Sequence, residues 1–159
     1  MSRRLIVLRH AKSDWPDGVP DHDRPLAARG RREAALAGRW LAEHAADIDL
    51  VVCSSAVRAR RTWKHAARQF DTAPQLRVED RLYAASHDRL VEVVRELPDA
   101  CRTVLFIGHN PGLEDVVNRL TGTWCPMKTS SIAVLSSRAP WAEASVRWAR
   151  LDDSITPRA

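Results

Sequence analysis

Cysteine is scarce in this sequence of 159 residues, and the three cysteines form no metal-binding or disulfide pattern. Cys53, Cys101 and Cys125 are odd in number and show neither C-x-x-C spacing nor a histidine at a matching interval. A disulfide framework and a zinc site are therefore not expected, and no carboxylate cluster suggests another metal or a cofactor. Cys53 ends an apolar run and Cys101 precedes one, which favours buried structural thiols.

Long apolar runs are also missing. The run at residues 5–8 is too short for the core of a secretory signal, and no run approaches the length of a transmembrane span. We therefore expect a cytoplasmic protein without a membrane segment. The length, the absence of an internal repeat or Gly-rich linker, and the globular content of 45% hydrophobic and 28% charged residues predict a single domain over residues 1–159.

Aromatic residues make up only 6% of the chain, and lysine occurs three times. Nearly all positive charge is therefore arginine, and the net charge is +5. A basic chain favours anionic ligands, although a solvated basic surface from arginine-rich coding explains the excess equally well. No aromatic base-stacking motif is present, so nucleic acid is not the expected partner.

Short apolar runs alternate with amphipathic stretches, a pattern typical of a layered α/β sheet. The predicted strands cover residues 5–8, 50–53, 76–78, 103–107, 132–135 and 146–151. The predicted helices run from about 28 to 46 behind Ala27, from Ser54 or Ser55 as cap to about 70, from Ser86 to Pro98, and onward from Asn110 as N-cap with Pro111 as first helical residue. Ala27 stands where Ser or Thr is usual, an exchange that costs about 1 kcal/mol at a helix start.

Three predicted strands are followed directly by groups that suit phosphate. They are Arg9 and His10 after residues 5–8, Ser54 through Arg58 after residues 50–53, and His109 after residues 103–107. Each group alone is more often structural than catalytic, but parallel strands bring their carboxyl ends to a common crevice. The helix that follows Asn110 points its positive end at the same crevice and favours an anion there, which makes Asn110 a candidate substrate-binding residue.

These residue types support phosphoryl transfer without a metal. A neutral His10 has a lone pair that can attack phosphorus. Arg9 and Arg58 can fork onto the equatorial phosphoryl oxygens and offset the charge of a loose transition state. His109 can donate a further hydrogen bond or a proton.

The chain resembles the histidine phosphatase superfamily, and within it the short SixA-type phosphohistidine phosphatases. Four segments carry the resemblance in order: Arg9-His10-Ala11, Arg24-Pro25-Leu26 with Gly30 following, Ser54 with Arg58-Ala59 and Thr62, and Gly108-His109-Asn110-Pro111-Gly112. It extends from residue 5 to about 136. Two positions depart from the family pattern, since Ala11 replaces a glycine and Ser55 a proline, and neither change removes a catalytic atom.

The resemblance implies a phosphoglycerate-mutase-like, three-layer α/β/α sandwich with a mostly parallel central sheet. It also implies that His10 is the residue transiently phosphorylated, in a pocket formed by Arg9, Arg58 and His109. Arg24 resembles a further basic residue that touches phosphate or substrate. The alternative for Arg24 is a loop arginine that pairs with Asp21 or Asp23.

The proton donor is less defined. Larger members of the superfamily use a glutamate after the third strand, and Glu79 falls in that region. The alternative is a solvated carboxylate that pairs with Arg77 or Arg81. A phosphoramidate leaving group needs little protonation, so the absence of a strong acid would favour phosphohistidine as substrate. Trp15, in the loop behind His10, either lines the mouth of the site or anchors the loop over the core; we favour the anchor.

The expected protein is thus a metal-independent, cofactor-free phosphatase that hydrolyses phosphohistidine of a protein through a phosphohistidine intermediate. No spare segment is left to cover the site, and an open site suits a bulky substrate. One alternative is a small-molecule phosphomonoesterase on the same scaffold. Another is a noncatalytic phosphate- or RNA-binding module, whose binding would survive loss of His10 and weaken steeply with salt. The sequence sets neither the physiological substrate nor the oligomeric state.

Overall fold

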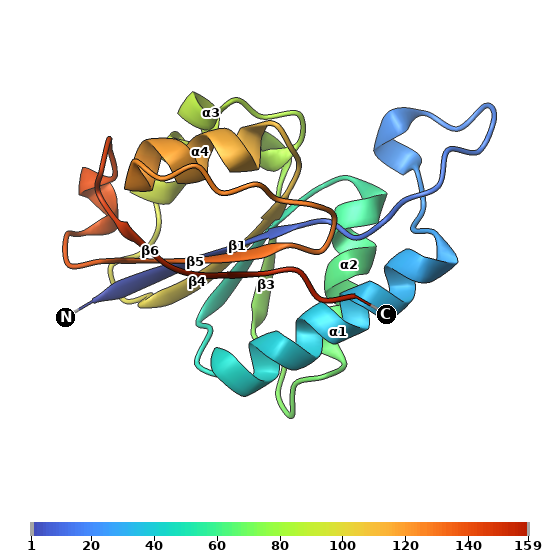
Figure 1. Ribbon diagram of the computed structural model, residues 1–159, viewed down its shortest axis with the longest axis horizontal. Helices are drawn as coiled ribbons and strands as arrows, with labels where there is room; N and C mark the ends of the chain where they lie inside the picture. The colour runs from blue at the N-terminus through green and yellow to red at the C-terminus, as the bar shows by residue number, and fades with distance from the viewer. Residues whose placement is uncertain (1, 159) are drawn as a thin grey trace.

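The computed structural model describes residues 2–158 and builds a six-stranded sheet with the strand order β3-β2-β4-β1-β5-β6 (Figure 1). The strands are β1 (Arg3–Arg9), β2 (Leu50–Ser54), β3 (Gln75–Glu79), β4 (Thr103–Gly108), β5 (Ile132–Ser137) and β6 (Arg150–Ile155). Strands β1 to β4 pair in parallel, whereas β5 and β6 are antiparallel to their neighbours. The predicted mostly parallel sheet is therefore confirmed.

Two helices cover each face of the sheet, which gives the predicted three layers (Figure 1). The helices α1 (Ala28–His44) and α2 (Val57–Ala67) lie on one face, and α3 (His87–Arg95) and α4 (Gly112–Thr121) on the other. Side chains alternate between the faces along each strand. Ile6 and Leu8 thus join the core under α1 and α2, while Leu5 and Val7 join the core under α3 and α4. Both faces are buried, so the central residues of the inner strands, such as 5–8 and 104–107, are apolar.

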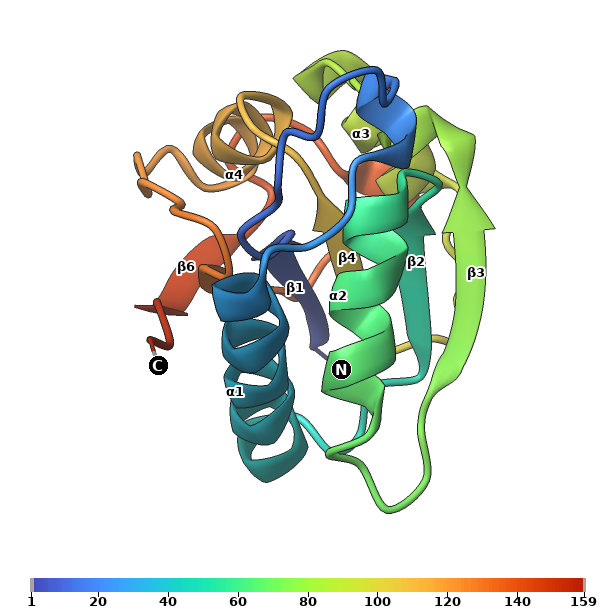
Figure 2. The ribbon, with the colours of Figure 1, turned by 90° about the vertical axis from the view of Figure 1, so that its right-hand side faces the viewer.

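The strand order brings the carboxyl ends of β1, β4 and β2 together. Arg9 pairs with Gly108 in the register of β1 and β4, and Cys53 pairs with Ile107 in that of β2 and β4. The segment between β1 and α1 contains a short 3₁₀ helix, η1 (Asp21–Asp23), and passes over the amino end of α2 (Figure 2). The loops that carry the predicted phosphate-binding groups therefore meet at one edge.

Helix starts differ from the predicted ones at two places. The N-cap of α2 is Ala56, and Ser54 Oγ accepts its N–H at 3.2 Å, so Ser54 braces the turn before the helix. The N-cap of α4 is Pro111, after a cis Asn110-Pro111 bond. Asn110 still contributes to this start, since its Oδ1 accepts the N–H of Glu114 at 3.3 Å. The predictions for Ala27 and Ser86 as N-caps are confirmed.

The last strand was misplaced by the sequence pattern. Residues 146–149 form a loop, in which Val146 is 68% exposed and Arg147 has a φ of 57°. Trp148 packs on Trp141 at a centroid distance of 5.6 Å and donates from Nε1 to the Pro140 carbonyl at 3.0 Å. The alternation of apolar residues therefore came from a tryptophan that anchors a loop, and the edge strand begins at Arg150.

Cys53 and Cys125 are buried and Cys101 is half-buried, and all three are free thiols. Among residues 2–158, no helix combines the length and the apolar character needed to cross a membrane.

Candidate active site

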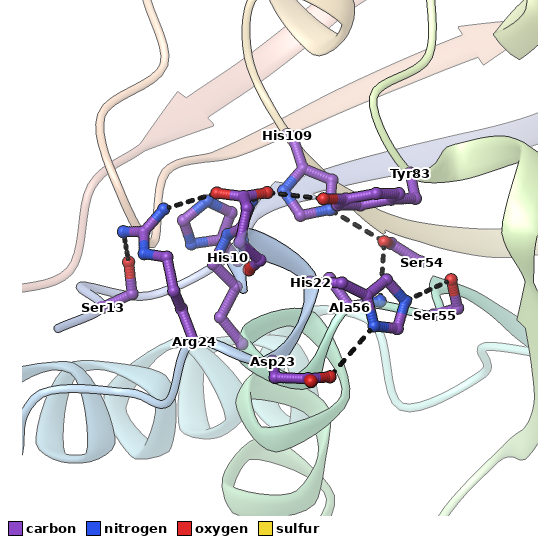
Figure 3. Close-up of polar contacts among 12 residues, drawn as sticks. His10, Ser13, His22, Asp23, Arg24, Ser54, Ser55, Ala56, Tyr83 and His109 are labelled. Atoms are coloured by element: carbon purple, nitrogen blue, oxygen red, sulfur yellow. Dashed lines mark hydrogen bonds and ion pairs between the residues drawn. The ribbon is translucent and has the colours of Figure 1, made fainter. Parts of the chain in front are cut away.

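A pocket of about 520 Å³ opens at the carboxyl edge of the sheet. Its walls include Asp21 from η1, Arg58 from α2, Tyr83 after β3, and His109 and Asn110 after β4. His10 lies beside this wall, with its ring centroid 5.0 Å from that of His109 (Figure 3). The structure thus brings together the groups from three strand ends, as the sequence predicts.

His10 is held in one tautomer by the backbone. Its side chain is buried, and Nδ1 lies 2.8 Å from the carbonyl oxygen of Ala11. A carbonyl only accepts hydrogen bonds, so Nδ1 carries the proton and Nε2 keeps its lone pair. Burial, and after it the charges of His109, Arg58 and Arg9, lower the pKa of His10 to about 3. The ring is neutral near pH 7 and its Nε2 can act as a nucleophile.

Thr62 ties the loop of His10 to α2. Its Oγ1 accepts the N–H of Ala11 at 2.9 Å and donates to the carbonyl of Arg58 at 2.8 Å, and its side chain is fully buried. The peptide that orients His10 is thereby fixed to the helix turn that presents Arg58.

Two predicted arginines flank the histidines. Arg58 lies in the first turn of α2 and is only 6% exposed. Arg9 is half-buried at the end of β1, and its Nη1 donates to the carbonyl of Met127 at 3.0 Å. The charges of both arginines help to lower the pKa of His10 and of His109. Such a site favours an anion of more than one charge.

Ser54 orients His109. Its Oγ lies 2.8 Å from Nε2 of His109 and accepts the N–H of Ala56, so the hydroxyl proton is free to point at Nε2 (Figure 3). In the tautomer that lets Ser54 donate to Nε2, the ring proton lies on Nδ1, which is buried and without a hydrogen-bond partner among residues 2–158. Burial, and next the charge of Arg58, lower the pKa of His109 to about 4. Nδ1 is thus a donor available to an oxyanion beside His10.

Arg24 forms the loop ion pair that the sequence analysis gave as the alternative to a contact with phosphate. Its guanidinium donates to Asp21 at 3.0 Å, the predicted loop ion pair, and also to Ser13 Oγ at 2.6 Å and the carbonyl of Asp14 at 3.1 Å. It is 6% exposed, and its guanidinium lies against Asp21, which lines the pocket. Trp15 stacks on it, with the Arg24 Cζ 3.2 Å from the ring centroid. Since Trp15 is 75% exposed, the prediction that it anchors the loop over the core is wrong. Its ring stacks on the Arg24 guanidinium instead.

Sequence reasoning missed Asp21 and Tyr83 as members of the site. The Asp21 carboxylate accepts from Arg24, from Arg58 at 3.2 Å and from the hydroxyl of Tyr83 at 2.6 Å. The Tyr83 ring stands edge-on to His109 at 5.7 Å. The sequence carries two signals for these residues: Tyr83 is the only tyrosine of the chain, and Asp21 precedes Arg24 by one turn. Neither signal indicates a contact across 62 residues.

Glu79 does not reach this pocket. Its carboxylate accepts from Nη2 of Arg81 at 2.9 Å and from the Arg81 N–H at 3.2 Å, and it lies 3.9 Å from Arg77. These contacts match the alternative of a surface ion pair. The hydrogen bond from Arg81 lowers the pKa of Glu79, which disfavours its protonated form. The structure therefore does not bring Glu79 together with His10.

Asn110 lines the pocket, but its polar atoms are engaged within the protein. Its Nδ2 donates to the carbonyl of Met127 at 2.7 Å, which also accepts from Arg9. Asn110 thus fixes the segment that positions Arg9. Among residues 2–158 there is no group of three or more His, Cys, Asp or Glu side chains arranged to hold a metal ion.

Known proteins resemble this chain in sequence and in fold. A profile of the histidine phosphatase superfamily (branch 1) matches residues 5–83. An uncharacterized protein of Mycobacterium tuberculosis is 40% identical over 162 residues, which cover 95% of this chain and 100% of the relative. A structure from Nakamurella multipartitia, provisionally assigned as a phosphohistidine phosphatase SixA, is 31% identical with a TM-score of 0.90, and the match covers 100% of this chain and 98% of that one.

A structure of the protein histidine phosphatase SixA complexed with tungstate has a TM-score of 0.84 at 22% identity over 97% of both chains, a likeness that concerns the fold alone. The sheet and its flanking helices match these structures, which confirms the predicted phosphoglycerate-mutase-like architecture. The profile and the likeness to the Nakamurella multipartitia structure in sequence and fold together show that this chain belongs to the histidine phosphatase superfamily.

Proposed function

We propose that this protein is a metal-independent phosphatase that hydrolyses phosphohistidine through a covalent intermediate on His10. One observation carries the proposal: the Ala11 carbonyl holds the proton of His10 on Nδ1, and Nε2 is left unprotonated beside two arginines. An imidazole so oriented is a nucleophile for a phosphoryl group. The arginines supply the positive charge that a metal provides in other phosphoryl-transfer sites.

The reaction proceeds in two displacements. In the first, Nε2 of His10 forms a bond to phosphorus while the bond to the leaving group breaks. Arg9 and Arg58 bind the equatorial oxygens, and Nδ1–H of His109 donates to one of them. In the second, water attacks phosphorus, the bond to Nε2 breaks, and orthophosphate leaves. Arg24, tied to Asp21 beside Arg58, supplies further positive charge at the same anion site.

Phosphohistidine is the substrate that makes the least demand on this site. The first displacement breaks one P–N bond to an imidazole and forms another, so the two sides of the step are chemically alike. The leaving imidazole needs less protonation than an alkoxide does. The similar structure from Nakamurella multipartitia is provisionally assigned to the same substrate class, which supports this choice.

A small-molecule phosphomonoesterase is the second candidate, and the size of the pocket favours it. A volume of about 520 Å³ lies within the range of small-ligand sites. Comparison of kcat/KM on a phosphohistidine peptide and on sugar or nucleotide phosphates separates the two. We further propose one catalytic domain that works in the cytoplasm, where free thiols such as Cys101 and Cys125 stay reduced.

The decisive experiment traps the intermediate. The protein is mixed with labelled phosphoramidate, quenched in alkali within milliseconds, and digested to locate the label. We expect acid-labile phosphate on His10, none in His10→Ala, and full labelling in the control His44→Gln, whose ring is exposed on α1 and stacks on Trp40. A chelator should leave turnover intact. Hydrolysis that persists in His10→Ala, or salt-sensitive phosphate binding without turnover, would refute the mechanism.

A further inference from the structure

The Asp21 carboxylate accepts hydrogen bonds from Arg24 and Arg58, the arginines that a phosphoryl group would need as donors. Its two oxygens accept from Arg24 at 3.0 Å and from Arg58 at 3.2 Å, and its backbone carbonyl accepts from Arg58 at 2.7 Å. These contacts come from two elements, the η1 segment itself and the first turn of α2. Tyr83, after β3, adds a third donor at 2.6 Å. A carboxyl group therefore stands at the anion site of the pocket.

The surroundings of Asp21 are almost entirely cationic or hydrogen-bond donating. Arg24, Arg58 and Tyr83 contact its oxygens, and His109 lies close enough for the charge of Asp21 to act on it. On its own turn, His22 contacts Asp23 and Ser55 and packs edge-on against Tyr83. The hydrogen bond from Tyr83, followed by those from the two arginines, holds the pKa of Asp21 well below its usual range.

A phosphoryl dianion reverses these conditions. It competes for the guanidinium groups of Arg24 and Arg58, so the carboxylate loses cationic partners and gains a negative neighbour. Loss of opposite charge and gain of like charge both favour the protonated carboxyl. The side chain of Asp21 is half exposed at the pocket, so a proton from solvent can reach it. Substrate binding itself thus creates a proton donor.

We propose that Asp21 is the catalytic acid and base of this site, made competent by the phosphoryl group that takes over its arginine partners. This inference rests on the proposed function. In the first displacement, Asp21 gives its proton to the leaving atom as the bond from that atom to phosphorus breaks and the Nε2–P bond of His10 forms. In the second, the Asp21 carboxylate takes a proton from the attacking water as the O–P bond forms and the Nε2–P bond breaks.

The test uses leaving groups that differ in their need for a proton. The variant Asp21→Asn keeps the shape of the side chain but cannot transfer a proton. We expect it to lower kcat/KM, which reports the first displacement alone, by about 10²- to 10³-fold on an alkyl phosphate, the usual contribution of a positioned acid, and by less than about tenfold on p-nitrophenyl phosphate. In the wild type, kcat on the alkyl phosphate falls as pH rises and Asp21 in the complex loses its proton. That basic limb should be absent from Asp21→Asn.

The matched control is Asp23→Asn, on the same 3₁₀ turn. The Asp23 carboxylate contacts His22 and, among residues 2–158, pairs with neither Arg24 nor Arg58. It should resemble the wild type with both substrates. Asp21→Glu, which keeps a carboxyl group, should retain the basic limb and part of the alkyl activity. Inorganic phosphate should bind Asp21→Asn at least as tightly as the wild type, because the arginines are released.

An equal loss of kcat/KM on both substrates, or a basic limb that survives in Asp21→Asn, would show that Asp21 only positions the arginines and would overturn the inference. The proposed function fails separately, if the wild type itself forms no adduct on His10. If Asp21→Asn forms that adduct from p-nitrophenyl phosphate and then hydrolyses it at the wild-type rate, the base role of Asp21 is refuted while the phosphatase mechanism stands.

Discussion

Replacement of Thr62 by valine tests how the fold holds the nucleophile. Thr62 Oγ1 accepts the N–H of Ala11 and donates to the carbonyl of Arg58, at a fully buried position. Valine keeps the shape of threonine but removes the acceptor. The carbonyl of Arg58 retains its helical hydrogen-bond partner, whereas the buried N–H of Ala11 loses the one that Thr62 supplied. The substitution therefore leaves one buried hydrogen-bond donor, the N–H of Ala11, unsatisfied next to His10.

The magnitude follows from that donor. A buried N–H left unsatisfied costs about 1–3 kcal/mol of unfolding free energy. For a chain of this length, each kcal/mol lowers Tm by about 2–4 °C, so Thr62→Val should melt about 2–12 °C below the wild type. Urea denaturation gives the free energy and a thermal scan gives Tm. Labelling of His10 should also slow, because the Ala11 peptide sets the acceptor for its Nδ1.

Two matched variants make the reasoning refutable. Thr62→Ser restores the acceptor and should recover most of the lost stability. Thr121→Val removes a similar hydroxyl, which donates to the Val117 carbonyl on α4 and accepts the N–H of Thr123. Because Thr123 is exposed, water replaces that bond and the cost should stay below about 1 kcal/mol. Equal stability of Thr62→Val and the wild type, or no recovery in Thr62→Ser, contradicts the argument.

Three further predictions concern separate parts of the molecule. Gly30→Ala should lower the unfolding free energy by about 1–3 kcal/mol or more, since the added Cβ would overlap the backbone carbonyl of Lys12; denaturation would show no change if the loop yields freely. Trp15→Ala removes a stacked ring worth about 0.5–1 kcal/mol to Arg24 and should raise KM about two- to fivefold at unchanged kcat, whereas a change in kcat alone argues against a binding role. The pKa of His109 is about 4 in the folded state and about 6.5 when unfolded, so as pH falls below 6.5 only the unfolded chain gains the proton. Unfolding free energy should therefore drop by up to about 1.4 kcal/mol per pH unit between pH 6.5 and 4 from this group, and His109→Asn should remove that share of the slope in urea titrations at pH 7 and 5.

Local sequence patterns predicted a helix or strand correctly where the pattern had a single structural meaning. The apolar run at residues 103–107 falls within β4, and the helical spacing after Ser86 yields α3 with the predicted cap. Patterns failed where a local signal had two meanings. The alternation around Trp148 is the same in an edge strand and in a loop anchored by one ring, and only the neighbouring Trp141 distinguishes them.

Helix starts failed for a related reason. A serine or asparagine before an apolar run can cap a helix or brace the turn ahead of it. Ser54 does the second, because its hydroxyl lies at the end of β2 within reach of both the Ala56 N–H and His109. Which of these partners a hydroxyl meets depends on the packing of another strand.

The sequence by itself determined the parts of the site that follow buried strands. Arg9, His10 and His109 must emerge at one edge once residues 5–8 and 103–107 form neighbouring parallel strands, because such strands share their carboxyl side. The tertiary structure alone decided which carboxylate joins them. Glu79 lies two residues before Arg81 in the chain and pairs with it, whereas Asp21 meets Tyr83 and Arg58 only when the η1 segment folds over α2. Hydrophobic periodicity encodes faces and edges, but a contact between distant polar side chains depends on how whole elements pack.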